Sequence, residues 1–119
     1  MSSIDLNTLK QRLREFADAR DWNQFHSPKN LTMALSVEVA EIVEHFQWLS
    51  EEQSKNLPQN KLDEVEAELA DTFIYLIRLA DKLDIDLFAA TEKKIGVNEQ
   101  KYPVEKARGN AKKYSEFDE

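Results

Sequence analysis

The sequence contains no cysteine and only two glycines and three prolines among its 119 residues. Without cysteine it can form no disulfide framework, so we expect a reducing, cytoplasmic setting. The scarcity of glycine argues against folds rich in strands and turns and against glycine-rich phosphate loops. No apolar run reaches the roughly 18 residues that a membrane span needs, and the first residues lack the basic start and apolar core of a signal peptide. The net charge of −7 argues against nucleic acid as a general partner.

What the chain does contain is helical periodicity. Apolar residues recur at steps of three and four, which predicts helices over residues 5–20, 31–49, 61–83 and 86–102. We expect Asn30 to cap the second helix, Ser50 and Gln53 to form a capping box, and residues 103–119 to form an irregular tail. These elements predict one all-α domain, 1–119, folded as a four-helix bundle.

The second and third predicted helices each carry an apolar stripe that we expect to form the core. The stripes comprise Leu35, Val39, Ile42, Phe46 and Leu49, and then Leu62, Val65, Leu69, Phe73, Leu76, Ala80 and Leu83. Beside each stripe runs what we call a polar row: Ala34, Glu38, Glu41, His45 and Trp48 in the second helix, and Glu64, Glu68, Asp71, Tyr75 and Arg78 in the third. Each row holds two carboxylates three residues apart, whose Cβ atoms lie about 5–6 Å apart on a helix.

Facing helices would bring these four carboxylates into one small volume. At about 4 Å, two like charges repel by about 4 kcal/mol at an effective dielectric constant near 20. The carboxylates must therefore bind protons, face water or hold cations, and oxygen ligands of this kind suit Mg²⁺. A di-iron centre is disfavoured because it needs Glu-x-x-His on two helices, whereas His45 follows Glu41 by four residues. The plain alternative is a solvated acidic helix face in a chain with 23 acidic residues.

Several segments together resemble a known family. Glu38-x-x-Glu41 followed by Glu68-x-x-Asp71 is similar to the signature of the MazG-like all-α nucleoside triphosphate pyrophosphohydrolases. The resemblance extends over roughly residues 9–117, and within the family it is closest to the dCTP pyrophosphatases. It is carried by RDWNQFHSPKNL (20–31), ALSVEVAEIVEHFQW (34–48), ELADTFIYL (68–76) and NEQKYPVEKARGNAKKYSEF (98–117).

The resemblance implies an Mg²⁺-dependent enzyme that cuts a deoxynucleoside triphosphate, dCTP or a relative, into the monophosphate and pyrophosphate. It also implies a homo-oligomer, usually a dimer of dimers, that acts in nucleotide-pool sanitation. The matching metal ligands are Glu38, Glu41, Glu68 and Asp71, and we take Glu41 as the residue that accepts the proton of the attacking water. The residues that match the family's base pocket are Trp22, His26, Trp48 and Tyr75. Their flat rings suit this role because such rings stack on bases.

Each of these roles has a structural alternative. Trp48 and Tyr75 could pack as amphipathic aromatics in the core, and His26 could be a structural loop residue. Arg14 departs from the family pattern, which has histidine there in close relatives, so the choice of base stays open. If the two long helices run antiparallel, Trp48 and Tyr75 flank the carboxylates from opposite ends. We therefore expect a partner subunit to supply one wall of the base pocket.

A basic strip lies toward the C-terminus. Residues 93–113 hold seven basic and two acidic residues, a net charge of +5, against −7 for the whole chain. Such a strip fits a clamp for substrate phosphates, although a solvated tail paired with the acidic surface would look the same. The residues we assign to the clamp are Lys94, Asn98, Lys101, Tyr102, Arg108 and Lys112; of these, Asn98 matches a family residue near the metals and phosphates, and Lys101 stands where relatives often carry arginine.

Two other functions remain compatible with the sequence. An all-α dUTP pyrophosphatase would share the metals and the chemistry. A non-catalytic helical interaction module would use the acidic row only for solubility.

Overall fold

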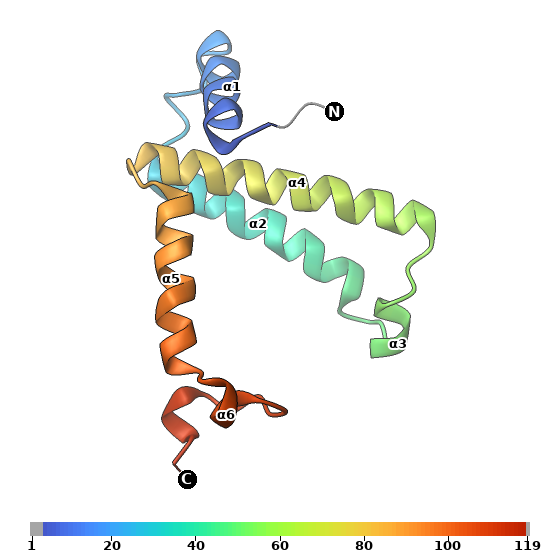
Figure 1. Cartoon of the computed structure of the whole chain (residues 1–119). Helices are drawn as coiled ribbons and strands as arrows, with labels where there is room; N and C mark the ends of the chain where they lie inside the picture. Colours follow the sequence, from blue (N-terminus) through green and yellow to red (C-terminus); the bar gives the residue numbers. More distant parts are fainter. Residues whose placement is uncertain (1–3, 119) are drawn as a thin grey trace. The chain divides into compact units, whose positions relative to one another are not determined.

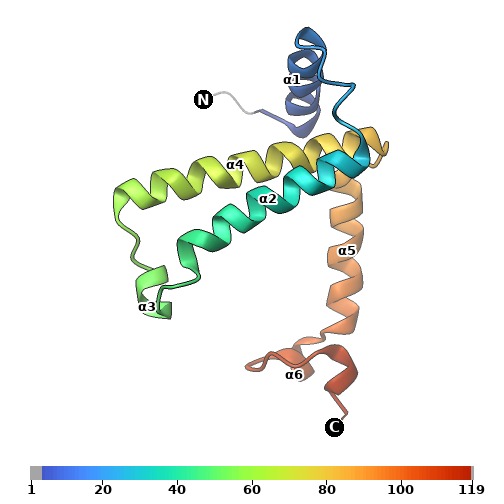
Figure 2. The same cartoon turned by 180° about the vertical axis from the view of Figure 1, so that it is seen from behind.

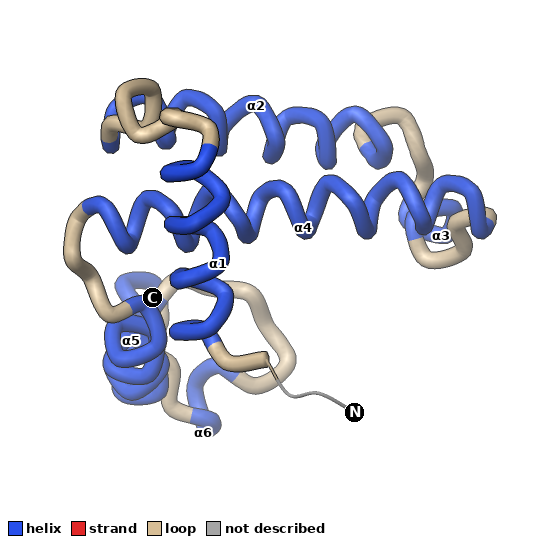
Figure 3. The backbone as a smooth tube through the Cα atoms, turned by 90° about the horizontal axis from the view of Figure 1, so that it is seen from above, coloured by secondary structure: helices blue, strands red, loops and turns tan. Residues whose placement is uncertain are grey.

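The computed structural model describes residues 4–118, and its regular structure there is entirely helical (Figures 1 and 3). The all-α prediction is therefore confirmed. The elements are α1 (Leu6–Ala19), α2 (Pro28–Phe46), α3 (Glu51–Ser54), α4 (Gln59–Lys82), α5 (Leu87–Lys101), α6 (Val104–Ala107) and the 3₁₀ helix η1 (Tyr114–Glu116). Among residues 4–118, no helix combines the length and the apolar character needed to cross a membrane.

The chain divides into two compact units, one ending at Ile85 and the other beginning at Asp86. The first unit holds α1 to α4, and the second holds α5, α6 and η1. A single bundle of four helices stays a prediction, because it depends on how the two units pack. Residues 103–119, expected to be irregular, contain the short α6 and η1 among their described residues.

The start of α2 lies one turn earlier than the periodicity predicted. Ser27 is the N-cap, and its Oγ accepts a hydrogen bond of 3.1 Å from the backbone N–H of Asn30. Pro28 occupies the first helical position, where a missing N–H costs nothing. Asn30, which we expected to be the cap, instead donates its side-chain amide to the carbonyl of Phe25. The prediction was wrong because Pro28 was taken only as a break and not as a helix start.

The link between α2 and α4 follows the sequence closely. Ser50 and Gln53 form the predicted capping box, with reciprocal hydrogen bonds of 2.9 and 3.1 Å, and they open the short α3. The chain then turns back at Pro58, the residue before α4. As a result α2 and α4 lie side by side and antiparallel (Figures 1 and 2). The α1 helix packs across α4 rather than along it (Figure 3).

The burial of the apolar stripes in α2 and α4 is only partial: Val65 and Ala80 are buried, and Leu35, Ile42 and Phe46 are half-buried. Fully buried apolar side chains in the described chain are few: Ala17, Leu31, Val65, Ile77 and Ala80. Most of the expected core stripe is exposed in the single chain, and Leu69 retains 54% of its surface. Other exposed members are Val39, Leu49, Leu62, Phe73, Leu76 and Leu83. The expected core stripes are therefore buried only in part in the single chain, and their other members lie on its surface.

Candidate active site

Four carboxylates of the polar rows meet where α2 faces α4. Glu38 and Glu41 come from α2, and Glu68 and Asp71 come from α4. One oxygen of Glu38 and one of Glu68 are buried without a hydrogen-bond partner. Burial, the contact with Glu41 and the charges of Asp71 and Glu68 raise the pKa of Glu38 above its ordinary value. The other three carboxylates therefore lie near enough to Glu38 for their charges to act on it, and the metal site itself stays a prediction.

His45 lies beside this cluster and contacts one of its carboxylates, Glu68. Its Nε2 is 2.7 Å from Oε2 of Glu68, and its Nδ1 is 3.8 Å from Oε2 of Glu64. The approach to Glu68 is close enough for an ion pair but is not aligned as a hydrogen bond, since that same oxygen has no hydrogen-bond partner. Lys61 reaches Glu64 at 3.3 Å. The sequence placed His45 in the polar row but gave it no role in the site.

The donor set of this cluster is suited to a hard cation. Hard divalent cations take oxygen ligands. Here one buried oxygen of Glu38 has no hydrogen-bond partner among the described residues, and that of Glu68 has only the close approach of His45. Among the described residues, no three acidic or histidine side chains are gathered tightly enough to hold a metal ion as they stand. The carboxylates fit a metal by the chemistry of their oxygen donors.

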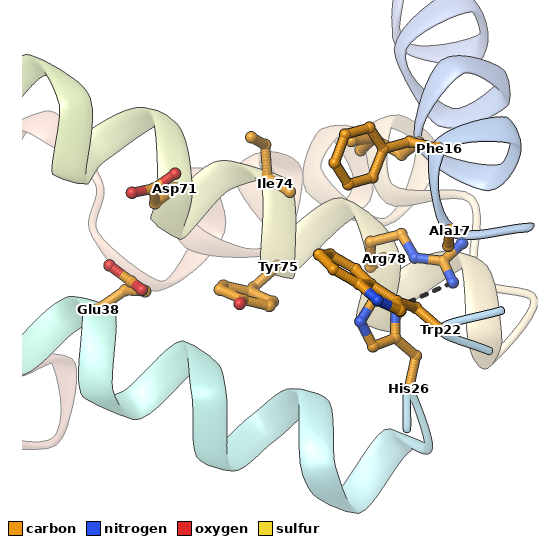
Figure 4. Close-up of a pocket in the computed structure, with 10 residues that line it drawn as sticks. Phe16, Ala17, Trp22, His26, Glu38, Asp71, Ile74, Tyr75 and Arg78 are labelled. Carbon is orange, nitrogen blue, oxygen red and sulfur yellow. Dashed lines mark hydrogen bonds between the residues drawn. The ribbon is translucent and has the colours of Figure 1, made fainter. Parts of the chain in front are cut away.

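A cavity of about 390 Å³ opens next to the carboxylates. It is lined by Trp22, His26 and Tyr75 together with Glu38 and Asp71, and its further walls are Leu13, Phe16, Ala17, Ile74 and Arg78. Figure 4 shows the two carboxylates at one end, Trp22 and His26 at the other, and Tyr75 between them. Its size and its mixture of aromatic walls with a few polar groups are typical of small-molecule sites.

The loop between α1 and α2 positions the aromatic end of the cavity. Asp21 adopts a left-handed backbone conformation with φ of 54°, and the backbone N–H of Trp22 donates to the carbonyl of Ala17. The Trp22 ring then packs edge to face against Phe16, at 5.5 Å between centroids, and against His26, at 6.1 Å. Burial, and then the charges of Arg78 and Lys82, lower the pKa of His26 below its ordinary value. The histidine is therefore neutral at physiological pH.

Arg78 is the pocket residue that the sequence analysis missed. It lines the cavity and keeps only 4% of its surface exposed. Its Nη2 donates to Oδ1 of Asn23 at 3.1 Å and lies 3.3 Å from Nδ1 of His26. A signal was available, because Arg78 follows Tyr75 by three residues in the same polar row. The sequence analysis placed Arg78 in that row but assigned it no role.

Trp48, which we expected to join the base pocket, is elsewhere. It follows the end of α2, keeps 87% of its surface exposed and does not line the cavity. The cavity of one chain thus gathers three of the four aromatic residues that we assigned to the base.

The residues assigned to the phosphate clamp all belong to the second unit. Lys94 and Asn98 lie on α5, and the Lys101 ammonium lies 4.8 Å from the centre of the Tyr114 ring. Tyr102 packs edge to face against Tyr114 and Phe117. Arg108 and Lys112 follow α6. Tyr102 therefore has a structural role in the tail, and the clamp itself stays a prediction.

Comparisons with known proteins give consistent results. A family model described as MazG-like matches residues 33–117. The dCTP pyrophosphatase 1 of Mus musculus is 41% identical over 114 residues, covering 94% of this chain and 67% of that protein. The Homo sapiens protein of the same name is 37% identical with the same coverage. A crystal structure of a pyrophosphatase from Archaeoglobus fulgidus matches with a TM-score of 0.79 and 40% identity, covering 87% of this chain and 96% of its own.

Proposed function

The chain belongs to the MazG-like family and is a nucleoside triphosphate pyrophosphatase, and from that premise we propose that it hydrolyses dCTP to dCMP and pyrophosphate with Mg²⁺. Removing dCTP would place it in the control of nucleotide pools. One observation carries the proposal: the buried, unpartnered carboxylate oxygen of Glu38 belongs to a residue that also lines the aromatic cavity. A phosphate chain held at the carboxylates would then leave its base among Trp22, His26 and Tyr75.

Glu38, Glu41, Glu68 and Asp71 would hold the metal. Bound there, Mg²⁺ would offset the charge of the phosphate oxygens and lower the pKa of a water molecule. Glu41 accepts the proton of the water that adds to the α-phosphorus, while the bond from that phosphorus to the bridging oxygen breaks and pyrophosphate leaves. Without a cation the four carboxylates would repel the substrate, so the same residues make metal necessary.

The chain's other polar groups bind and orient the substrate. Trp22 and Tyr75 offer flat faces for stacking, which is worth about 1–3 kcal/mol per base. Lys94, Lys101 and Arg108 supply positive charge for the phosphates, and Asn98, Tyr102 and Lys112 supply hydrogen-bond donors.

The direct test is pyrophosphate release from all eight common nucleoside triphosphates, with and without Mg²⁺. We expect dCTP to be hydrolysed with the highest kcat/KM and only in the presence of the cation. Glu41→Gln and Glu68→Gln should each lose activity by orders of magnitude, because a neutral amide is a poor metal ligand. Glu66→Gln is the matched control, since Glu66 is exposed on α4 and makes no ion pair in the described part of the chain. Full activity of both Glu41→Gln and Glu68→Gln would contradict the assignment of these residues to the metal. A higher kcat/KM for dUTP than for dCTP would favour the alternative function, an all-α dUTP pyrophosphatase.

We also propose that the enzyme works as a homo-oligomer, a dimer of dimers, with a shared site. The exposed apolar stripe, with Leu69 and Phe73 on α4, is suited to pack against a second copy. Trp48 lies outside the cavity of its own chain, so a partner could place it on the base of the neighbouring site. This arrangement would explain why an 87% exposed tryptophan stands in the family's base-binding segment.

Mixing inactive subunits tests the shared site. Glu68→Gln protomers would lack a metal ligand, and Trp48→Ala protomers would lack one wall of the base pocket. If the site is shared, exchange of subunits restores part of the activity, because some pockets regain both groups from different chains. Exchange that is proven by mass spectrometry but gives no recovery would mean that each chain builds its own pocket.

A further inference from the structure

The buried end of the cavity contains a charged group whose hydrogen-bonding capacity is not filled. Arg78 lines the cavity, and its Nε is buried without a hydrogen-bond partner. Its Nη2 is engaged with Asn23 and His26, and its Nη1 lies 3.9 Å from Oδ2 of Asp81. Buried guanidinium groups without an acceptor are costly and rare. Arg78 is thus a buried donor, with unfilled hydrogen-bonding capacity, in the wall of this cavity.

Arg78 also fixes the direction in which His26 can hydrogen bond. A guanidinium group only donates, so Nδ1 of His26, 3.3 Å from Nη2, must accept. The lowered pKa keeps the ring neutral, and its single hydrogen is then on Nε2. His26 therefore offers a donor, as the indole of Trp22 also does.

The two ends of the cavity differ in their hydrogen-bonding character. Carboxylates of Glu38 and Asp71 stand at one end, and the N–H groups of Trp22, His26 and Arg78 stand at the other (Figure 4). If the phosphates lie near the carboxylates, the base reaches an environment of donors. A base is then favoured when it presents acceptors there and disfavoured when it presents an N–H.

We propose that Arg78, together with the histidine that it orients, is a specificity-determining residue that selects cytosine through its acceptor edge. Cytosine carries two adjacent acceptors, O2 and N3. Uracil and thymine carry an N–H at position 3, which would face a donor and leave both unpaired. A site whose buried donors are arranged to pair with acceptors of the substrate strongly rejects a base that presents an N–H to them. The inference rests on the proposed function, since it takes this cavity as the base pocket of a nucleoside triphosphatase.

Substrate analogues test the proposal on the unmodified protein. The comparison is kcat/KM for dCTP, for dUTP, and for 3-deaza-dCTP, in which a C–H group replaces N3. We expect dUTP and 3-deaza-dCTP each to be about 10- to 100-fold poorer than dCTP, the range for one hydrogen bond to a charged group. Equal kcat/KM for dCTP and 3-deaza-dCTP would overturn the proposal, because the N3 acceptor would then not be read.

A substitution links the effect to Arg78. Arg78→Met keeps a long apolar stem but removes every donor, so the preference for dCTP over dUTP should shrink by about tenfold or more. Lys82→Met is the matched control, because Lys82 also bonds Oδ1 of Asn23, at 3.2 Å, but does not line this cavity. The control should retain the preference of the wild type.

The outcomes separate a specificity role from a structural one. If Arg78→Met lowers kcat/KM for dCTP and dUTP by the same factor, the arginine only holds the loop with Asn23 and His26, and the proposal fails. Should the variant not fold, as judged by its melting temperature, the analogue comparison on the wild type decides alone. Failure of the wild type to hydrolyse any nucleotide would overturn the proposed function itself, and this inference with it.

Discussion

Replacing Glu38 by glutamine should stabilise the metal-free protein and abolish its hydrolytic activity. Glu38 has a buried oxygen without a hydrogen-bond partner, and its neighbours Glu41, Glu68 and Asp71 carry the same charge. Glutamine has nearly the same shape, removes the charge, and offers an amide that can donate to a neighbouring carboxylate. The substitution therefore removes repulsion and satisfies a buried polar site in one step.

The size of the effect follows from the unpaired oxygen. A buried polar group without a partner costs about 1–3 kcal/mol, so we expect Glu38→Gln to raise the free energy of unfolding by about 1–2 kcal/mol. For a chain of this length that corresponds to roughly 4–8 °C in melting temperature. A cation at a hundred times its dissociation constant would stabilise the wild type by about 2.7 kcal/mol. The order of stabilities should therefore reverse when Mg²⁺ is added.

The assay is thermal unfolding of both proteins in EDTA and in saturating Mg²⁺, at one protein concentration. In EDTA the variant should melt higher, and in Mg²⁺ the wild type should. Since the pKa of Glu38 is raised in the folded state, the advantage of the variant in EDTA should be full above that raised pKa, shrink as the pH falls through it, and vanish below the ordinary glutamate pKa. Glu44→Gln, at an exposed position on the same helix, should leave the melting temperature unchanged both in EDTA and in Mg²⁺. A variant that melts lower in EDTA, or that gains as much from Mg²⁺ as the wild type, would refute the reasoning.

Three further predictions follow from other parts of the chain. Asp81→Asn should lower the free energy of unfolding at neutral pH, because Asp81 accepts a 2.7 Å hydrogen bond from Nε of Arg14. That bond lowers the pKa of Asp81 in the folded state. The loss of stability, measured by urea unfolding, should therefore be full above the ordinary aspartate pKa and vanish as the pH falls through the lowered pKa of the folded state. Lys94→Ala and Arg108→Ala should raise KM, lower kcat, or both, and wild-type rates at subsaturating dCTP would show that the basic strip is a solvated tail. Leu69→Glu should shift the protein toward smaller species in analytical ultracentrifugation, since a charge would interrupt the exposed apolar stripe, and an unchanged mass would remove that stripe from the subunit interface.

The local signals in the sequence were sufficient for the secondary structure. Helical periodicity gave the all-α class, and the reciprocal pairing of Ser50 with Gln53 formed as predicted. The start of α2 was missed by one turn, because proline before a helix can either end one segment or begin the next. Local rules of this kind depend on a few neighbouring residues, so the sequence carries them directly.

The polar rows were found from spacing, but the role of each member was not. The end of α2 at Phe46 takes Trp48 off the helix, so the spacing that linked it to Glu38 no longer applies. Arg78 became buried only because the loop after α1 folds back and brings Asn23 and His26 onto it. Residues more than 50 positions apart meet there, and no local pattern predicts such a meeting.

The sequence by itself determined which residues share a face of each helix, because a period of 3.6 residues fixes that. Only the tertiary structure decided which face turns toward the neighbouring helix. The apolar stripe containing Leu69 and the polar row containing Glu68 are both regular, and apolarity alone favoured burying the stripe. In the single chain Glu68 is half-buried, whereas its neighbour Leu69 keeps 54% of its surface, and Glu38 and Asp71 line one end of the aromatic cavity.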